Sequence, residues 1–226
     1  MLDILITNAT LPDGRTGQSI AIQGDRIVEV GPSVSGDAGR TIDAGGCLVT
    51  PPFIDPHFHL DSTLSLGEPR LNQSGTLLEG IQLWGELKPH LTGDAIKQRV
   101  RELARWSIAK GTLAIRSHVD TSDPRMINVD ALIEVREELK PYIDIQLVAF
   151  PQDGFFRSPG AAENLTRALD KGVDVVGGIP HFERTMEDGS RSVRALCEIA
   201  AERGLRVDMH CDETDDPMSR HIEMLT

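Results

Sequence analysis

The spacing of apolar residues changes near Pro51, so the chain divides into two parts with different patterns. Before that point, alternating apolar runs at 20–23 and 26–30 flank a Gly-Asp pair, and this arrangement predicts a β-hairpin. Two further apolar runs lie at 4–6 and 47–50. The first part therefore predicts a small antiparallel β-module that contains no helix.

After Pro51, apolar runs of strand length alternate with amphipathic stretches of helix length. Strands are expected at 113–119, 143–150, 173–179 and 205–210, and helices at about 94–110, 128–140, 161–171 and 192–203. This alternation predicts βα units and a parallel sheet. With the apolar run before His57 there are five strands, so the α/β fold is either an open sheet or part of a (β/α)₈ barrel, which needs eight.

Composition and charge exclude several classes of function. The net charge of −12 is spread along the chain without a basic stripe, which disfavours nucleic-acid binding. No apolar run approaches the roughly 18 residues of a membrane span. The N-terminus lacks the features of a signal peptide, and three widely spaced cysteines do not form a disulfide framework. We therefore expect a cytoplasmic protein with a small-molecule partner, not a nucleic acid or a membrane.

Three histidines and a carboxylate at the predicted strand ends have the composition of a hydrolytic metal site. His57 and His59 are two residues apart, so on a strand both side chains point to the same side, and imidazole suits zinc or iron. His210 follows another strand and precedes Glu213 by three residues. Three neutral ligands plus a carboxylate that moves protons are the groups that metal-assisted hydrolysis needs. The alternatives are a pair of loop histidines and, at 210–214, an ordinary helix start.

Other polar residues also follow strands. The amide of Gln152 either satisfies loop backbone or binds a substrate that carries both hydrogen-bond donors and acceptors. We interpret His118 and His181 as histidines that support a site or lie at the edge of the core.

Four segments, in this order, carry a resemblance to a known family. They are residues 49–61 (VTPPFIDPHFHLD), 72–80 (NQSGTLLEG), 148–152 (VAFPQ) and 210–213 (HCDE). With the β-module before them, they resemble the bacterial cytosine deaminases of the amidohydrolase superfamily. The His-x-His pair alone indicates only the superfamily, whereas the other three segments are more specific. Relatives that act on isocytosine, substituted triazines or creatinine share parts of the pattern.

The resemblance implies a fold and an incomplete chain. It implies a TIM-type (β/α)₈ barrel over 51–226, truncated after about five βα units, and a β-sandwich module over 1–50 that a C-terminal segment of the full-length protein completes. A sixth-strand histidine and an eighth-strand aspartate of that family are not in this sequence. We expect the N-terminal part of a longer, homo-oligomeric enzyme, with little or no activity as a separate chain.

The resemblance also implies the roles of individual residues. His57, His59 and His210 would bind one divalent ion, Fe²⁺ or Zn²⁺, and Glu213 would shuttle a proton to a ring nitrogen. The substrate-binding residues would be Gln152, Leu77 and Phe150.

The implied reaction is the hydrolytic deamination of cytosine to uracil and ammonia, or of a close aminopyrimidine analogue, in pyrimidine salvage. Alternatives at the same site are isocytosine, creatinine or an N-substituted aminotriazine as the substrate, and opening of a cyclic amide. A different class of alternative is a non-catalytic binding subunit derived from the barrel.

Overall fold

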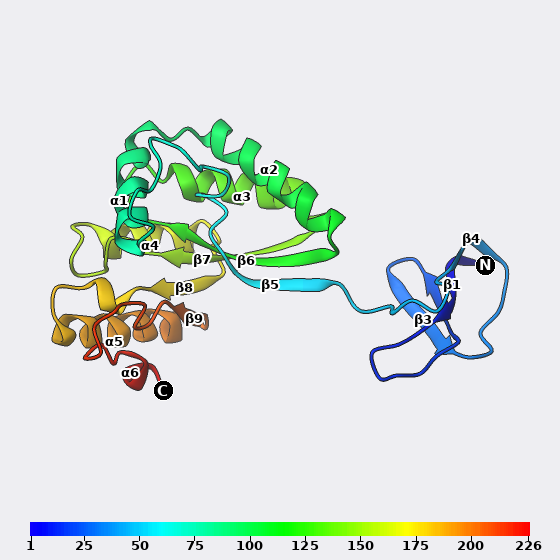
Figure 1. Cartoon of the computed structure of the whole chain (residues 1–226). Coiled ribbons are helices and arrows are strands. Elements are labelled where there is room, and N and C mark those ends of the chain that lie inside the picture. The colour runs from blue at the N-terminus through cyan, green and yellow to red at the C-terminus, as the bar shows by residue number, and fades with distance from the viewer. The chain divides into compact units, whose positions relative to one another are not determined.

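The computed structural model describes all 226 residues, and the chain forms two compact units, Met1–Pro52 and Phe53–Thr226 (Figure 1). None of its helices is long and apolar enough to cross a membrane.

The first unit contains one four-stranded sheet with the strand order β3-β2-β1-β4. Its strands are β1 (Leu2–Ala9), β2 (Gln18–Gln23), β3 (Arg26–Gly31) and β4 (Ala38–Asp43). The predicted hairpin is confirmed, because β2 and β3 pair antiparallel on either side of the Gly-Asp turn.

Two details of the first unit differ from the sequence prediction. β4 pairs parallel to β1, so the sheet is mixed and not wholly antiparallel. The apolar run at 47–50 forms only an isolated bridge between Thr10 and Leu48, while the fourth strand comes from 38–43, where most side chains are polar or exposed. A second sheet that would make a sandwich stays a prediction.

The second unit contains a parallel five-stranded sheet in which the spatial order follows the chain order. Its strands are β5 (Phe53–Phe58), β6 (Thr112–Asp120), β7 (Asp144–Phe150), β8 (Val175–Gly178) and β9 (Arg206–Met209). The sequence prediction of five parallel strands is therefore confirmed. β7 lies at the centre, and its last four residues are all buried, as expected of a strand covered on both faces.

The helices of this unit are α1 (Leu77–Leu87), α2 (Gly93–Ala109), α3 (Ile127–Leu139), α4 (Ala161–Asp170), α5 (Met186–Arg203) and α6 (Ile222–Leu225), with 3₁₀ turns η1 (Lys88–His90) and η2 (Pro180–Phe182). In Figure 1, α2 and α3 cover β6 and β7, and α5 lies beside β8 and β9. Threonine hydroxyls cap the N-termini of α1, α2 and α5, each accepting a backbone N–H three residues further on.

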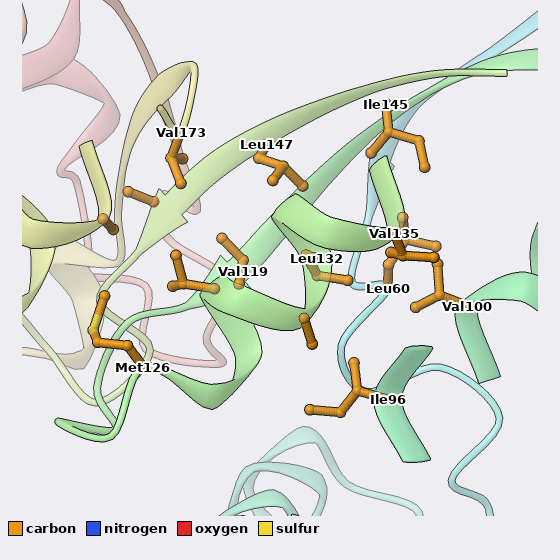
Figure 2. Packing of buried hydrophobic residues seen from close by; sticks show 14 of the residues in the cluster. Leu60, Ile96, Val100, Val119, Met126, Leu132, Val135, Ile145, Leu147 and Val173 are labelled. Carbon is orange, nitrogen blue, oxygen red and sulfur yellow. The ribbon is translucent and has the colours of Figure 1, made fainter. Parts of the chain in front are cut away.

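The main hydrophobic core lies between these helices and the sheet. Figure 2 shows Leu132 and Val135 of α3 packed near Val119 of β6 and Leu147 of β7, with Ile96 from α2 beyond them. This core sets the position of β6 and β7, and therefore of the residues at their carboxyl ends.

The sheet is curled. Four spacings of about 4.8 Å would separate the outer strands of a flat five-stranded sheet by roughly 19 Å. Yet His59, which follows β5, and His210, which follows β9, approach to 3.1 Å between their Nε2 atoms. The second unit is therefore a half-barrel whose two outer strands turn toward each other.

Candidate active site

Four imidazole rings gather where the carboxyl ends of the strands converge. His57 and His59 come from β5 and its end, His118 comes from β6, and His210 follows β9. The ring centroids of every pair lie 4.6–5.4 Å apart. Phe58, between the first two, packs against the core instead, which confirms the alternation expected of a strand.

The geometry of these nitrogens fits a divalent ion. One nitrogen from each of His57, His59 and His118 lies within 4.8 Å of the others. The Nε2 atoms of His59 and His210 are 3.1 Å apart, close to the roughly 3.4 Å between two imidazole nitrogens on one tetrahedral zinc ion. The Nδ1 atoms of His118 and His210 are buried without a hydrogen-bond partner, and such orphaned atoms are uncommon unless another group completes the site.

The charge state of the rings also suits metal binding. Burial, assisted by the neighbouring imidazoles, lowers the pKa of His59 to about 4 and that of His210 to about 3. Both rings are therefore neutral at pH 7, and a neutral imidazole has the lone pair that a metal ligand needs.

His118 was interpreted from the sequence as a supporting residue, and the structure places its ring inside the cluster. Its side chain is fully buried, and its Nε2 lies 3.3 Å from Asp208 Oδ1. Arg116 binds the other oxygen of Asp208 at 2.7 Å. The contact with His118 and that with Arg116 together hold the pKa of Asp208 well below its usual range, so a charged carboxylate fixes the orientation of His118.

A cavity of about 450 Å³ opens beside the histidines. The residues that the sequence predicted for the site all line it: His57, His59, His210, Glu213, Gln152, Leu77 and Phe150. Phe150 is buried with its ring 4.5 Å from that of His210, whereas the Leu77 side chain, 48% exposed, lies at the rim. The structure thus brings the predicted residues together, and their individual roles stay predictions.

Two buried aspartates lie on the cavity wall, and neither was assigned a role from the sequence. Asp61 accepts hydrogen bonds from the Asp120 backbone N–H and from Asn128 Nδ2, and burial raises its pKa to about 7. Asp120 accepts from Trp84 Nε1 at 2.7 Å and pairs with Lys88 at 2.9 Å. The sequence does contain a signal for both, because Asp61 and Asp120 each lie two residues after a histidine of the cluster, and side chains two residues apart on a strand point to the same side.

Comparison with known proteins shows which family has this fold and sequence. The family model of the amidohydrolase family matches residues 40–226. The chain belongs to the amidohydrolase family. Within it, the chain is 34% identical to N-isopropylammelide isopropyl amidohydrolase of Pseudomonas sp. (strain ADP), over 92% of this chain and 53% of that protein. It is 28% identical to pterin deaminase of Rhizobium rhizogenes, over 94% of this chain and 51% of that protein.

Solved amidohydrolase structures agree with the half-barrel. The crystal structure of 5-methylcytosine deaminase from Klebsiella pneumoniae with 5-fluorocytosine matches with a TM-score of 0.93 and 42% identity, over 98% of this chain and 54% of that one. N-isopropylammelide isopropylaminohydrolase from Burkholderia multivorans matches with a TM-score of 0.81 and 30% identity, over 100% of this chain and 57% of that one. The chain thus spans about half the length of the relatives it matches.

In this amidohydrolase chain, the loop that carries Gln152 is held from two directions. Lys88, the first residue of η1, pairs with Asp153 at 2.6 Å as well as with Asp120. On the other side, Glu183 accepts hydrogen bonds from the backbone N–H groups of Phe156 and Arg157 at 3.0 and 2.8 Å. Gln152 therefore lies on a fixed loop, not on a free one.

The loop that carries Glu213 is held in place by hydrogen bonds to the preceding residue, Asp212. Asp212 accepts hydrogen bonds from the backbone N–H groups of His221 and Ile222, at 2.8 and 3.0 Å, and from the Ser219 hydroxyl at 2.7 Å. Asp212 adopts a left-handed conformation, with φ of 59°. These bonds close the segment after β9 into a loop that presents Glu213 to the cavity.

Proposed function

We propose that this chain carries the metal-binding and ring-binding residues of a hydrolytic deaminase acting on cytosine or a 5-substituted cytosine. The observation that carries the proposal is the convergence of three histidines, Glu213 and Gln152 on one cavity. The 42% identity to a 5-methylcytosine deaminase supports the choice of ring.

Each group has a task in the proposed reaction, in which cytosine and water give uracil and ammonia. His57, His59 and His210 would hold a divalent ion, which would supply the Lewis acidity that lowers the pKa of water. Glu213 takes up a proton and delivers it to the ring nitrogen beside the carbon that carries the amine. Gln152 donates to and accepts from the amide edge of the pyrimidine, because its side chain has both an NH₂ and a carbonyl.

The apolar walls explain why a flat ring fits. Phe150 and Leu77 lie on the cavity lining and offer carbon surface to the ring faces. Burying those faces excludes water from the reacting carbon and strengthens the polar contacts around it.

A second candidate substrate is an N-substituted aminotriazine, favoured by the 34% identity to an N-isopropylammelide amidohydrolase. Both substrates have a nitrogen substituent on a six-membered ring, so one site could release either ammonia or an alkylamine. A panel of cytosine, 5-methylcytosine, isocytosine and N-isopropylammelide separates the candidates by the amine released.

The decisive experiment uses the protein in the longest form that its gene encodes, loaded with Fe²⁺ or Zn²⁺. His57→Ala is expected to abolish both bound metal and amine release, while Glu213→Gln keeps the metal and lowers kcat about 10²- to 10⁴-fold. His90→Ala is the control, because His90 is exposed on η1 and does not line the cavity. Amine release from no member of the panel, with metal bound, would contradict the proposal.

A further inference from the structure

His181 lies on the cavity wall between the predicted ring-binding and proton-transfer residues. It belongs to η2, directly after β8, and β8 lies between β7, which precedes Gln152, and β9, which precedes Glu213. All three residues line the same cavity.

One hydrogen bond determines which nitrogen of His181 carries the proton. Nδ1 lies 3.1 Å from the backbone carbonyl oxygen of His210. A carbonyl oxygen can only accept, so Nδ1 must be the donor. In the neutral ring, the other nitrogen, Nε2, then has a lone pair and no hydrogen.

The Nε2 atom of His181 is free to receive a hydrogen bond from a ligand. It has no hydrogen-bond partner in the structure, and it is not among the buried orphaned atoms, so part of its surface is accessible. His181 thus brings to the cavity wall an accessible acceptor that belongs neither to a proposed metal ligand nor to Glu213.

We propose that His181 is a substrate-contacting residue whose Nε2 accepts a hydrogen bond from an N–H of a nucleobase-like ring. The inference rests on the proposed function and adds to it a third polar contact on the ring. A ligand N–H opposite Nε2 gains a hydrogen bond, whereas a carbonyl oxygen at the same place faces a lone pair. His181 therefore favours ligands with an amino group or a ring N–H on that side.

The first test determines which nitrogen of the neutral His181 ring carries the proton. Two-bond ¹⁵N–¹H correlation spectra of the protein, with His181 assigned by substitution, should show a protonated Nδ1 and an unprotonated Nε2 in the neutral ring. Adding cytosine should move the Nε2 resonance in the direction of an accepted hydrogen bond. A proton on Nε2 instead would overturn the inference.

The second test separates the two nitrogens. His181→Asn retains an N–H near the position of Nδ1, which can still donate to the His210 carbonyl, but it removes Nε2. Measured by calorimetry in the metal-loaded Glu213→Gln background, which keeps the ligand intact, cytosine should bind about fivefold more weakly. The metal content should not change. His90→Asn makes the same chemical change at an exposed position outside the cavity and should leave both quantities unaltered.

The outcomes distinguish the two proposals. If His181→Asn binds cytosine as tightly as the parent, this inference is wrong and the proposed function stands. If the parent itself binds neither cytosine nor 5-methylcytosine with metal present, the proposed function fails and this inference fails with it.

Discussion

Gly177 occupies a place in β8 where no side chain fits. A Cβ atom there would lie 2.6 Å from the Ala149 carbonyl oxygen and 2.9 Å from Val148 Cγ1. Both neighbours belong to β7, and the first is backbone, so neither can move without disturbing the centre of the sheet. Gly85 of α1 is the opposite case, since a Cβ atom there would meet nothing within 4 Å.

We predict opposite effects of alanine at these two glycines. Gly177→Ala should lower the free energy of unfolding by about 1–3 kcal/mol through overpacking. Gly85→Ala should raise it by about 0.5–1 kcal/mol, because glycine in an exposed helix interior is entropically unfavourable. Denaturant titration of both variants measures the difference, and two effects of the same sign would contradict the packing described for β8.

Lys88 forms ion pairs with two carboxylates beside the cavity, those of Asp120 and Asp153. Burial alone would lower its pKa, but Asp120 and Asp153 outweigh that effect, and the pKa lies above its ordinary value. Lys88→Met leaves the buried Asp120 without its cation, so we predict a loss of about 3 kcal/mol of stability. Lys171→Met is the matched control, because Lys171 pairs with Asp130 at the exposed surface and such pairs contribute under about 1 kcal/mol. Equal losses in thermal or denaturant unfolding would refute a buried role for Lys88.

At the residue scale, sequence reasoning succeeded where the relation was local. His57 and His59 share a face because a strand has a period of two, and that rule needs no knowledge of the rest of the fold. The surroundings of His118 and His181 depend on Asp208 and on the His210 carbonyl, which are 90 and 29 positions away. The contact with Asp208 joins β6 to β9 and needs the curl of the sheet, while the contact with the His210 carbonyl needs the shape of the loops after β8 and β9, so neither partner could be named from the sequence.

At the scale of elements, the loop after β7 depends on a carboxylate from the following βα unit. Glu183 accepts hydrogen bonds from three successive backbone N–H groups, those of Phe155, Phe156 and Arg157. This arrangement fixes the loop that begins with Gln152 without using any regular secondary structure.

We predict that Glu183→Gln loosens this loop alone. The amide NH₂ replaces one accepting oxygen and cannot bond to a backbone N–H, so hydrogen exchange at residues 155–157 should accelerate roughly tenfold or more. Exchange within β7 should not change. Glu187→Gln, at an exposed position in the first turn of α5, is the control. Uniform acceleration through β7 would show that Glu183 stabilises the whole sheet and not the loop.

Helix α1 and the first turns of α5 were not predicted from the sequence. Residues 77–87 form α1, yet Leu77 and Leu78 at its start are largely exposed, and its buried residues are only Leu83 and Leu87. α5 begins at Met186, six positions before the predicted start, because its first turn is polar and is set by the Thr185 cap. The hydroxyls of Thr76 and Thr185 cap the two helices and fix where each begins.

At the scale of the whole molecule, the half-barrel has two outer strands that each pair on one side only. β5 pairs with β6 and β9 pairs with β8. On β5, Phe53 and Ile54 are 61% and 70% exposed. An outer strand with exposed apolar side chains is a template for pairing with another chain.

We predict that the 226-residue chain self-associates through β5. Ile54→Lys should shift the sedimentation profile toward the monomer, because a charged side chain on an outer strand opposes strand pairing. Tyr142→Lys adds the same charge at an exposed position in the turn before β7 and should leave the profile as it was. Equal association in both variants would exclude β5 as the contact.

The parallel sheet could be predicted from the alternation of strand and helix patterns, but its curl could not. The curl depends on how α2, α3 and α5 pack against the strands. That packing in turn depends on the volumes of side chains throughout the core, which the alternation of strand and helix patterns does not specify. The same limit applies to the site, because its candidate ligands could be named from residue type, whereas their convergence followed only from the curled sheet.

The contact between His59 and His210 joins positions 151 residues apart, at the two outer strands of the sheet. During translation, His57, His59 and His118 emerge early, but the two rings that we propose as ligands, His59 and His210, are not both present until His210 has left the ribosome. Ion capture by both rings can therefore occur only after all five strands have been synthesised and have curled. On stalled nascent chains of increasing length, a rise in retained metal once His210 is exposed would mark the moment at which the two outer strands turn toward each other.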